Sequence, residues 1–453
     1  MTTDLVILLG VFFVLLALRM PVAFALGLAA VCAALAAALP HAVAMGSVWP
    51  TINAALQSLV LRMAQGIYVP ALMPIPFFIF AGELMSTGNV ARRLVALANL
   101  VIGSVRGGLG MVNVMVCMFF GGITGSSVAE ASAVGSLMVP MMEDEGYDRD
   151  YAAALTVGAS TQGIIIPPSH NAIIYSLAAA GVVSVSIAEL FLGGLIPGVL
   201  IGVTLMVANY FISHARRYPV RQRRITLREA ARVLWEGALA MLTPIIIVVG
   251  IVGIPPWIQG FFTATEAGAV AAIYAFLLTF VIHRDLPLRE LPGILKRSVI
   301  TISIVMLLIA TSSAFGLVLA QQRVPEALTA AMLSISENPV VLLLILNVGL
   351  LIIGTFMDMA PAILILTPIL LPAVTEIGMS PVHFGIMLML NLAIGLTTPP
   401  VGTTMFVGCA IGRTTVERLS RSLILIWPAM VTALLLVTYI PQLTLWVPGL
   451  LSR

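Results

Sequence analysis

Two clusters of polar and glycine residues lie inside long apolar stretches of this chain, where few polar groups are expected. Hydroxyl, carboxylate and free carbonyl oxygens are the ligands that hard cations prefer, so we predict two sites for a small cation such as sodium. The first predicted site contains Gly125, Ser126, Ser127, Ser160, Thr161 and Gly163. The second contains Gly354, Thr355, Asp358, Gly395, Thr397 and Thr398.

Each cluster leads into two consecutive prolines, Pro167-Pro168 and Pro399-Pro400. Proline removes a helical hydrogen bond and clashes with the preceding turn, so we expect each helix to unwind there and to leave carbonyls free. The half-helix that resumes after the break directs the positive end of its dipole at the break, which suits a carboxylate. The polar residues beyond the breaks are our candidates for binding a substrate: Ser169, His170, Asn171, Thr403 and Thr404.

The two clusters belong to a repeated segment, because residues 122–181 align without a gap with residues 354–413. The identities fall on residues that interrupt helices. They pair Gly122 with Gly354, Pro140 with Pro372, Gly146 with Gly378, Gly163 with Gly395, and the two double prolines with each other. Chance matches in this chain would fall mostly on Ala, Leu, Val and Ile. The repeated interruptions therefore indicate a duplicated unit.

The composition places most of the chain in lipid. Hydrophobic residues make up 60% of it and charged residues 9%, too few to cover a water-soluble globule. A helix needs about 20 residues to cross a bilayer. We expect crossings near residues 5–20, 21–40, 67–87, 149–181, 187–212, 238–254, 264–282, 299–320, 381–411 and 422–447. Residues 108–143 and 340–375 are instead predicted to be helical hairpins that enter and leave on one face, because each has a polar or glycine-rich midpoint.

The predicted fold is an all-α polytopic membrane protein with an inverted-topology repeat, because each half contains an odd number of crossings besides its hairpin. We predict a first repeat at residues 1–212, a basic linker at 213–236 and a second repeat at 237–453. Nearly all of the 22 Lys and Arg residues then lie on one side, the exceptions being Arg62, Arg323 and Arg453. The positive-inside rule makes that side cytoplasmic. Both termini are then periplasmic, the first hairpin opens to the cytoplasm and the second opens outward.

Further segments carry scattered charges on apolar helical patterns, and we expect them to lie at the membrane surface and to brace a fixed frame. They are residues 49–65, 89–106, 284–297 and 322–338. The basic linker is expected to rest on anionic lipid rather than to bind nucleic acid.

Asp358 is the sharpest single candidate, because burying an unpaired carboxylate near the middle of a membrane costs at least ~2.5 kcal/mol. We therefore expect a cation or a proton beside it. The alternative is a helix cap exposed to a water-filled vestibule. Glu83, Glu130 and Glu266 are expected to be satisfied locally, since each lies near a helix end or a Gly/Ser/Thr cluster. His170 could donate to a carboxylate or pack as a neutral ring.

The interrupted segments resemble the large membrane subunit of the tripartite ATP-independent periplasmic (TRAP) transporters, within the ion-transporter superfamily. The resemblance covers nearly the whole chain and is carried by residues 125–127, 163–169, 354–358 and 395–402. It implies sodium-driven import of an organic acid by an elevator motion, in which hairpins and broken helices carry the substrate past a fixed scaffold. It also implies a bacterial inner membrane location, a small four-helix membrane subunit and a periplasmic substrate-binding protein as partners, and no cofactor besides the coupling sodium.

One departure from the family concerns the substrate. Many members carry apolar residues after the first double proline, whereas this chain has His170-Asn171. C4-dicarboxylates, sialic acid, keto acids and other carboxylates therefore all stay open.

The alternatives are a stand-alone transporter of the same superfamily, which needs no binding protein, and a channel lined by the interrupted helices. An enzyme is not expected, because the chain has no His-Glu-x-x-His run, no Gly-x-Ser-x-Gly turn and no intramembrane aspartate pair.

Overall fold

The computed structural model describes residues 3–18, 20–218, 226–254, 258–336, 338–399 and 402–451. The first helices are α1 (Thr3–Ala17), α2 (Val22–Ala44), α3 (Val48–Ile67), α4 (Pro74–Thr87), α5 (Val90–Ile102), α6 (Gly108–Thr124), α7 (Ser127–Asp144), α8 (Arg149–Ala159), α9 (Gln162–Ile165), α10 (His170–Ala179) and α11 (Ile187–Ala215). The later helices are α12 (Leu227–Val252), α13 (Ala264–Phe276), α14 (Leu291–Gln321), α15 (Val324–Ile335), α16 (Pro339–Phe356), α17 (Met359–Glu376), α18 (Pro381–Gly395), α19 (Thr403–Gly412), α20 (Val416–Leu423), α21 (Trp427–Tyr439) and α22 (Gln442–Leu451). Short 3₁₀ turns lie at Pro70–Leu72 and Leu288–Glu290, a π-helical turn lies at Leu277–Ile282, and the strands β1 (Gly253–Ile254) and β2 (Ile258–Gln259) pair antiparallel.

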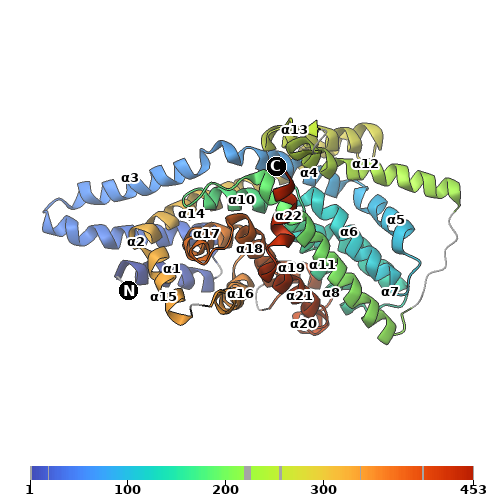
Figure 1. The fold of residues 1–453 in the computed structure, drawn as a ribbon. Coiled ribbons are helices and arrows are strands. Elements are labelled where there is room, and N and C mark those ends of the chain that lie inside the picture. Colours follow the sequence, from blue (N-terminus) through green and yellow to red (C-terminus); the bar gives the residue numbers. More distant parts are fainter. Residues whose placement is uncertain are drawn as a thin grey trace.

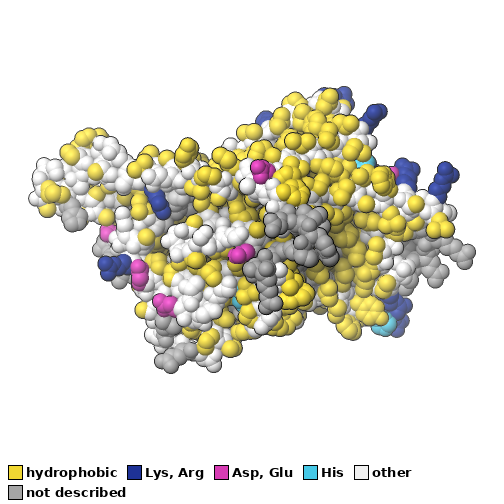
Figure 2. All heavy atoms as spheres, turned by 45° about the horizontal axis from the view of Figure 1, so that its top comes forward, with side chains coloured by type: hydrophobic (Ala, Val, Ile, Leu, Met, Phe, Trp, Pro, Cys, Tyr) yellow, Lys and Arg dark blue, Asp and Glu magenta, His cyan; other side chains and the backbone are white. Residues whose placement is uncertain are grey.

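The helices have the length and composition of membrane spans. Among the described residues, eight stretches are long and apolar enough to cross a membrane, and a ninth results if α20 and α21, bent by 54° at their junction, form one span. The eight are Val22–Ala44, Pro70–Thr87, Ile187–Ala215, Leu227–Val252, Ala264–Ile282, Leu288–Gln321, Pro339–Phe356 and Met359–Glu376. Hydrophobic side chains cover much of the face in Figure 2, and Lys and Arg stand mainly near its margins. The chain is therefore a multi-pass membrane protein.

Some elements differ from the sequence prediction. Residues 284–297 were expected to form a separate surface segment, and this is wrong for residues 291–297. They begin the 31-residue helix α14, which has a proline at its start and no further proline before Gln321. The predicted crossing at 422–447 is divided among α20, α21 and α22, with Pro428 at the start of α21 and Pro441 before α22. Proline at a helix start fixes where each of these helices begins.

The helices form two groups that pack side by side (Figure 1). We call α6–α11 and α16–α22 the inner helices, since α11 contacts α6, α9, α18, α21 and α22, and α19 contacts α7 and α8. We call α1–α5 and α12–α15 the frame helices; here α14 contacts α2, α3 and α4, and α13 contacts α4 and α12. The two groups meet where α4 and α5 pack on α6, and where α14 and α15 pack on α17. Large side chains such as Phe120, Tyr151, Phe191 and Phe384 are fully buried among the inner helices.

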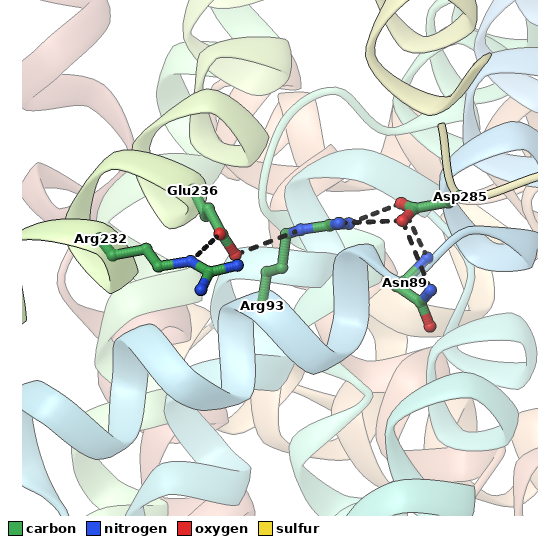
Figure 3. Close-up of polar contacts among 5 residues, drawn as sticks. All are labelled: Asn89, Arg93, Arg232, Glu236 and Asp285. Carbon is green, nitrogen blue, oxygen red and sulfur yellow. Dashed lines mark hydrogen bonds and ion pairs between the residues drawn. The ribbon is translucent and has the colours of Figure 1, made fainter. Parts of the chain in front are cut away.

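A polar cluster ties separate frame elements together (Figure 3). Arg93 on α5 donates to Asp285 with Nη2–Oδ1 at 2.9 Å, and the backbone N–H of Asn89 donates to the same carboxylate at 3.3 Å. Glu236 on α12 lies 3.7 Å from Arg93 and 2.8 Å from Arg232. Burial alone would raise the pKa of the Asp285 carboxyl. The hydrogen bonds and positive charge of Arg93, together with the hydrogen bonds from Asn89, outweigh burial and hold this pKa below its usual value. The cluster therefore joins α5, α12 and the loop before α14 by charge.

Candidate functional site

The first hairpin turns at residues that leave the helical conformation. Gly125 ends α6 with φ +63°, a left-handed conformation that favours glycine. Ser126 then caps α7, because its side chain accepts a hydrogen bond from the backbone N–H of Ala129 at 3.4 Å. The tip thus consists of polar residues with backbone groups outside the helical pattern, as the sequence predicted.

The second hairpin turns at Asp358. Its Oδ1 accepts a hydrogen bond from the backbone N–H of Met359 at 3.0 Å and so caps α17. The Asp358 side chain is exposed and lines a cavity. The expectation that this carboxylate is buried is therefore wrong, and the alternative of a helix cap facing an open space is what the structure shows. The reason is tertiary, since Asp358 faces a cavity that α4 and α14 also line. Thr355, nearby, donates to Ile352 O at 2.8 Å.

Both predicted helix breaks are present. In the first half α8 ends at Ala159, the single turn α9 follows, and α10 begins at His170 after Pro167-Pro168. In the second half α18 ends at Gly395 and α19 begins at Thr403. Pro400 lies outside the described residues, whereas Pro399 precedes it in the turn. The polypeptide therefore leaves the helical conformation twice between buried inner helices.

The hydroxyl groups of the two breaks all donate to carbonyls of their own turn. Ser160 donates to Val157 O at 2.9 Å and Thr161 to Gly158 O at 2.7 Å. In the second break Thr397 and Thr398 both donate to Ile394 O, at 2.7 and 3.0 Å. A hydroxyl that donates keeps its oxygen lone pairs, so each can still act as a cation ligand.

Each hairpin packs on the break that follows it, through glycines. A side-chain carbon on Gly354 would lie 3.2 Å from Gly395 Cα, so these backbones touch. In the first half Gly121 lies in the same way against Gly163. Closer to the first tip, a side-chain carbon on Gly125 would lie 3.1 Å from both Pro168 O and His170 Nδ1. Among the described residues, no hydrogen bond joins Ser160 or Thr161 to Ser126 or Ser127. The first hairpin instead meets the break through Gly121 and Gly163, and meets the residues after the break through Gly125.

The first hairpin also contacts the second half. Ser127 Oγ and Thr404 Oγ1 lie 2.8 Å apart, and both side chains are buried. This bond joins the start of α7 to the start of α19, across the two repeats. Sequence reasoning named both residues but assigned Thr404 to the substrate, because nothing local in the sequence indicates a partner so distant along the chain.

A cavity of about 640 Å³ lies between the two hairpin tips and the frame helices α4 and α14. Of the predicted site residues it contains Ser126, Ser127, His170, Asn171 and Asp358. The remaining lining residues come mainly from α4, α7 and α14; they include Glu83, Ser86, Ser132 and Thr301, which the sequence analysis did not assign to the site. Glu83, Ser86 and Thr301 lie on frame helices and Ser132 lies on α7, and nothing in their local sequence indicates a site.

The other predicted substrate residues lie elsewhere. Ser169 is buried and donates to Ile164 O at 2.5 Å, and neither Thr403 nor Thr404 lines the cavity. Asn171 contributes to the site in a further way, because its amide donates to Gly125 O at 3.4 Å and joins α10 to the first tip.

Two charged side chains, Glu83 and Asp358, line the cavity, and among the described residues only Glu83 has an ion-pair partner. Glu83 pairs with Arg297 of α14 at 3.2 Å, and Arg297 also donates to Thr87 at 2.9 Å. Among the described lining residues there is no Lys or Arg. An anion in this cavity would therefore meet helix ends, hydroxyls and amides instead of a basic side chain.

Residues 9–443 match the family model DctM, described as the DctM component of the tripartite ATP-independent periplasmic transporter. The chain is 40% identical to the uncharacterized protein YgiK of Salmonella typhimurium, over 99% of this chain and 98% of that protein. It is 38% identical to the sialic acid TRAP transporter large permease protein SiaM of Vibrio cholerae, over 86% and 88% of the two chains. It is 36% identical to the isethionate TRAP transporter permease protein DctMQ of Oleidesulfovibrio alaskensis, over 98% of this chain and 66% of that longer protein.

Among solved structures, the fold is similar to that of the Alcanivorax borkumensis YdaH transporter, with a TM-score of 0.63, 15% identity and coverage of 88% of this chain and 90% of that one. It is also similar to Neisseria gonorrhoeae MtrF, with a TM-score of 0.54, 13% identity and coverage of 86% and 84%. At these identities the likeness concerns the fold alone.

Proposed function

Because this chain belongs to the family of large membrane subunits of TRAP transporters, we propose that it is the permease subunit of a sodium-coupled importer of an organic acid. The family is one of transport proteins of the inner membrane, which implies that the chain is not an enzyme. The substrate, the coupling ion, the direction and the partners are the parts that we propose.

One observation supports an anionic substrate most strongly: three helix N-termini converge on the cavity. The first residues of α7 (Ser127, Val128, Ala129), of α10 (His170, Asn171) and of α17 (Met359, Ala360) all line it. The backbone N–H groups that Ser126 and Asp358 do not already cap, and the positive end of the helix dipole, attract carboxylates at such positions. An organic acid can thus be held without a basic side chain.

Sodium coupling is proposed from the oxygen atoms of the two breaks, whose neighbouring residues Ile164 and Leu396 line the same cavity. Each hairpin and the break behind it bring together hydroxyl and carbonyl oxygens with lone pairs to spare. A sodium ion at either place lies close to the anionic substrate, and the attraction between them favours joint binding. Asp358, at the second tip, adds a negative charge that a cation would offset.

An elevator motion is proposed from the interface between the two helix groups. The frame contributes α4 and α14 to one wall of the cavity, and the inner helices contribute both tips to the other. Gly82 on α4 lets the first tip approach closely, since a side-chain carbon there would lie 3.3 Å from Thr124 Cα. In this proposal the inner helices carry the cavity past the frame, and the chain keeps the inverted repeat and the topology predicted above, with both termini periplasmic.

The proposed partners follow the family: a small membrane subunit beside the frame and a periplasmic protein that delivers the substrate. Residues 213–236, rich in arginine, stay on the cytoplasmic side in this proposal, against anionic lipid.

The test is uptake by proteoliposomes that contain this chain and its small partner. Sialic acid, isethionate and C4-dicarboxylates, which relatives are named for, form the first substrate panel. We expect saturable uptake of one acid that requires an inward sodium gradient and the cognate binding protein. Potassium and choline gradients serve as controls. Uptake without the binding protein would favour a stand-alone transporter, and non-saturating flux that ignores the sodium gradient would favour a channel.

A further inference from the structure

The carboxyl group of Glu130 is buried without a compensating charge among the described residues. Glu130 lies in the first turn of α7, its side chain is fully buried, and neither of its oxygens has a hydrogen-bond partner in the part of the chain that the structure describes. Nearby hydroxyl groups were expected to satisfy this carboxyl group. That expectation is wrong, because its Oε2 lies against the backbone of Gly163 and Gly121 and no described hydroxyl group bonds to it.

The Glu130 carboxylate lies where the first hairpin crosses the first break. Its Oε2 occupies the place that a side chain on Gly163 would take, and a side-chain carbon on Gly121 would lie 3.1 Å from the same oxygen. The carboxylate is thus in contact with the backbone at the end of the α8–α9 turn. This is the junction at which the first sodium site is proposed.

The charges facing Glu130 do not compensate it. Among the described residues of the helices packed against α7, the one titratable group that interacts with Glu130 is the thiol of Cys117 on α6. That thiol lies beside the Glu130 carboxyl group and also donates to Asn113 Oδ1 at 3.8 Å. A neutral thiol carries no positive charge, so it cannot compensate an ionised carboxylate. An ionised carboxylate buried without a partner is costly, so either a proton or a cation must neutralise Glu130.

The second repeat provides a useful comparison. In the gap-free alignment of the repeats, Ser126 corresponds to Asp358 and Glu130 corresponds to Ala362. Each half therefore has one carboxylate within a turn of its hairpin tip, but at different positions. In the second half it caps α17 and faces the cavity, whereas in the first half it points to the break.

We propose that Glu130 is the anionic ligand of a sodium ion at the junction of the first hairpin with the α8–α9 break. The inference rests on the proposed function, since it assigns a charged ligand to one of the two proposed ion sites. Carbonyl oxygens of the break supply further ligands, because a carbonyl oxygen that accepts one hydrogen bond still has a second lone pair. Each of the two ions then has one carboxylate partner.

The experiment is a sodium titration of thermal unfolding of the purified full-length protein, with choline replacing sodium at constant ionic strength. A ligand that binds the folded state raises the unfolding midpoint as its concentration exceeds its Kd. Glu130→Gln keeps the size of the side chain and removes its charge. We expect it to raise the sodium concentration for half-maximal stabilisation at least about tenfold, which is ~1.4 kcal/mol of binding free energy.

Glu143→Gln is the matched control, because Glu143 lies on the same helix but is exposed and paired with Arg149 at 2.7 Å. It should leave the sodium titration unchanged. If Glu130→Gln also leaves it unchanged while the unmodified protein responds to sodium, the inference about Glu130 is overturned and the proposed function stands. If sodium does not stabilise the unmodified protein, sodium coupling itself fails, and the inference fails with it.

A second measurement keeps Glu130 intact, in case Glu130→Gln does not fold. The chain has three cysteines, so Cys32→Ala with Cys409→Ala leaves only Cys117, the buried thiol beside Glu130. Sodium bound at Glu130 should slow labelling of Cys117 by a membrane-permeant maleimide, with the same half-effect concentration as the unfolding titration. A labelling rate equal in sodium and choline, in a protein that sodium stabilises overall, would contradict the proposal.

Discussion

The contact between Gly354 and Gly395 makes a graded prediction possible. A methyl group on Gly395 would lie 2.7 Å from both Gly354 Cα and C, and backbone atoms cannot give way as a flexible side chain can. A methyl group on Gly354 would lie 3.2 Å from Gly395 Cα and 3.4 Å from Leu392 Cα, which smaller shifts relieve. Gly349, also on α16, would meet nothing within 4 Å. The structure therefore orders three identical substitutions by their cost.

We expect Gly395→Ala to destabilise the protein by about 1–3 kcal/mol, the usual cost of overfilling a packed interior. Gly354→Ala should cost less, and Gly349→Ala should be neutral or stabilising by up to about 1 kcal/mol, because alanine favours the helix. Sodium-dependent uptake should fall in the same order, since a displaced break no longer holds its oxygens beside the hairpin.

The assay combines the apparent unfolding midpoint of the detergent-solubilised protein, at a fixed heating rate, with initial uptake rates in proteoliposomes. Gly349→Ala is the control for the methyl group itself. If Gly395→Ala and Gly349→Ala had the same unfolding midpoint and the same uptake rate, function would not require the close packing of the hairpin on the break.

Three other predictions follow from the site and the frame. Ser127→Ala and Thr404→Val, alone and together, should show a coupling of about 0.5–1.5 kcal/mol in unfolding, because their hydroxyls lie 2.8 Å apart; independent effects would contradict the bond. Asp285→Asn should lower stability by about 2 kcal/mol near pH 7. Because the pKa of Asp285 is lower in the folded state, its stabilisation is fully present above the ordinary carboxyl pKa and is lost as the pH falls through the folded-state pKa. The unfolding curves of the variant and the unmodified protein should therefore converge in acid. Replacing Pro167-Pro168 by Ala-Ala should abolish uptake and leave a folded protein by circular dichroism, since the restored hydrogen bonds close the break; retained uptake would show that the break is not needed.

The parts of the fold that the sequence predicts well are those with local causes. Pro167-Pro168 ends one helical segment by its own chemistry, and a half-helix, α10, resumes after the break as predicted. Gly125, with its left-handed conformation, and Asp358, as a cap, mark the two hairpin tips for similar reasons. Such residues stand out because everything around them is apolar.

The parts that the sequence does not predict depend on where one helix lies relative to another. Asp358 was expected to be buried and instead faces a cavity whose opposite wall is formed by α4 and α14. Glu130 has hydroxyl groups nearby in sequence, yet its side chain points at Gly163. Thr404 meets Ser127 only because the two repeats pack against each other. Hydrophobic periodicity carries no information about these pairings.

In the proposed function, the transported acid binds between the two hairpin tips. The most direct measurement is an experimental structure of the complex with sodium and the acid that gives uptake. We predict density for the acid in the cavity of about 640 Å³, with its carboxylate at the N-termini of α7 and α10, near Ser127 and His170. Density for the acid outside this cavity, with the cavity empty at saturating substrate, would contradict the account.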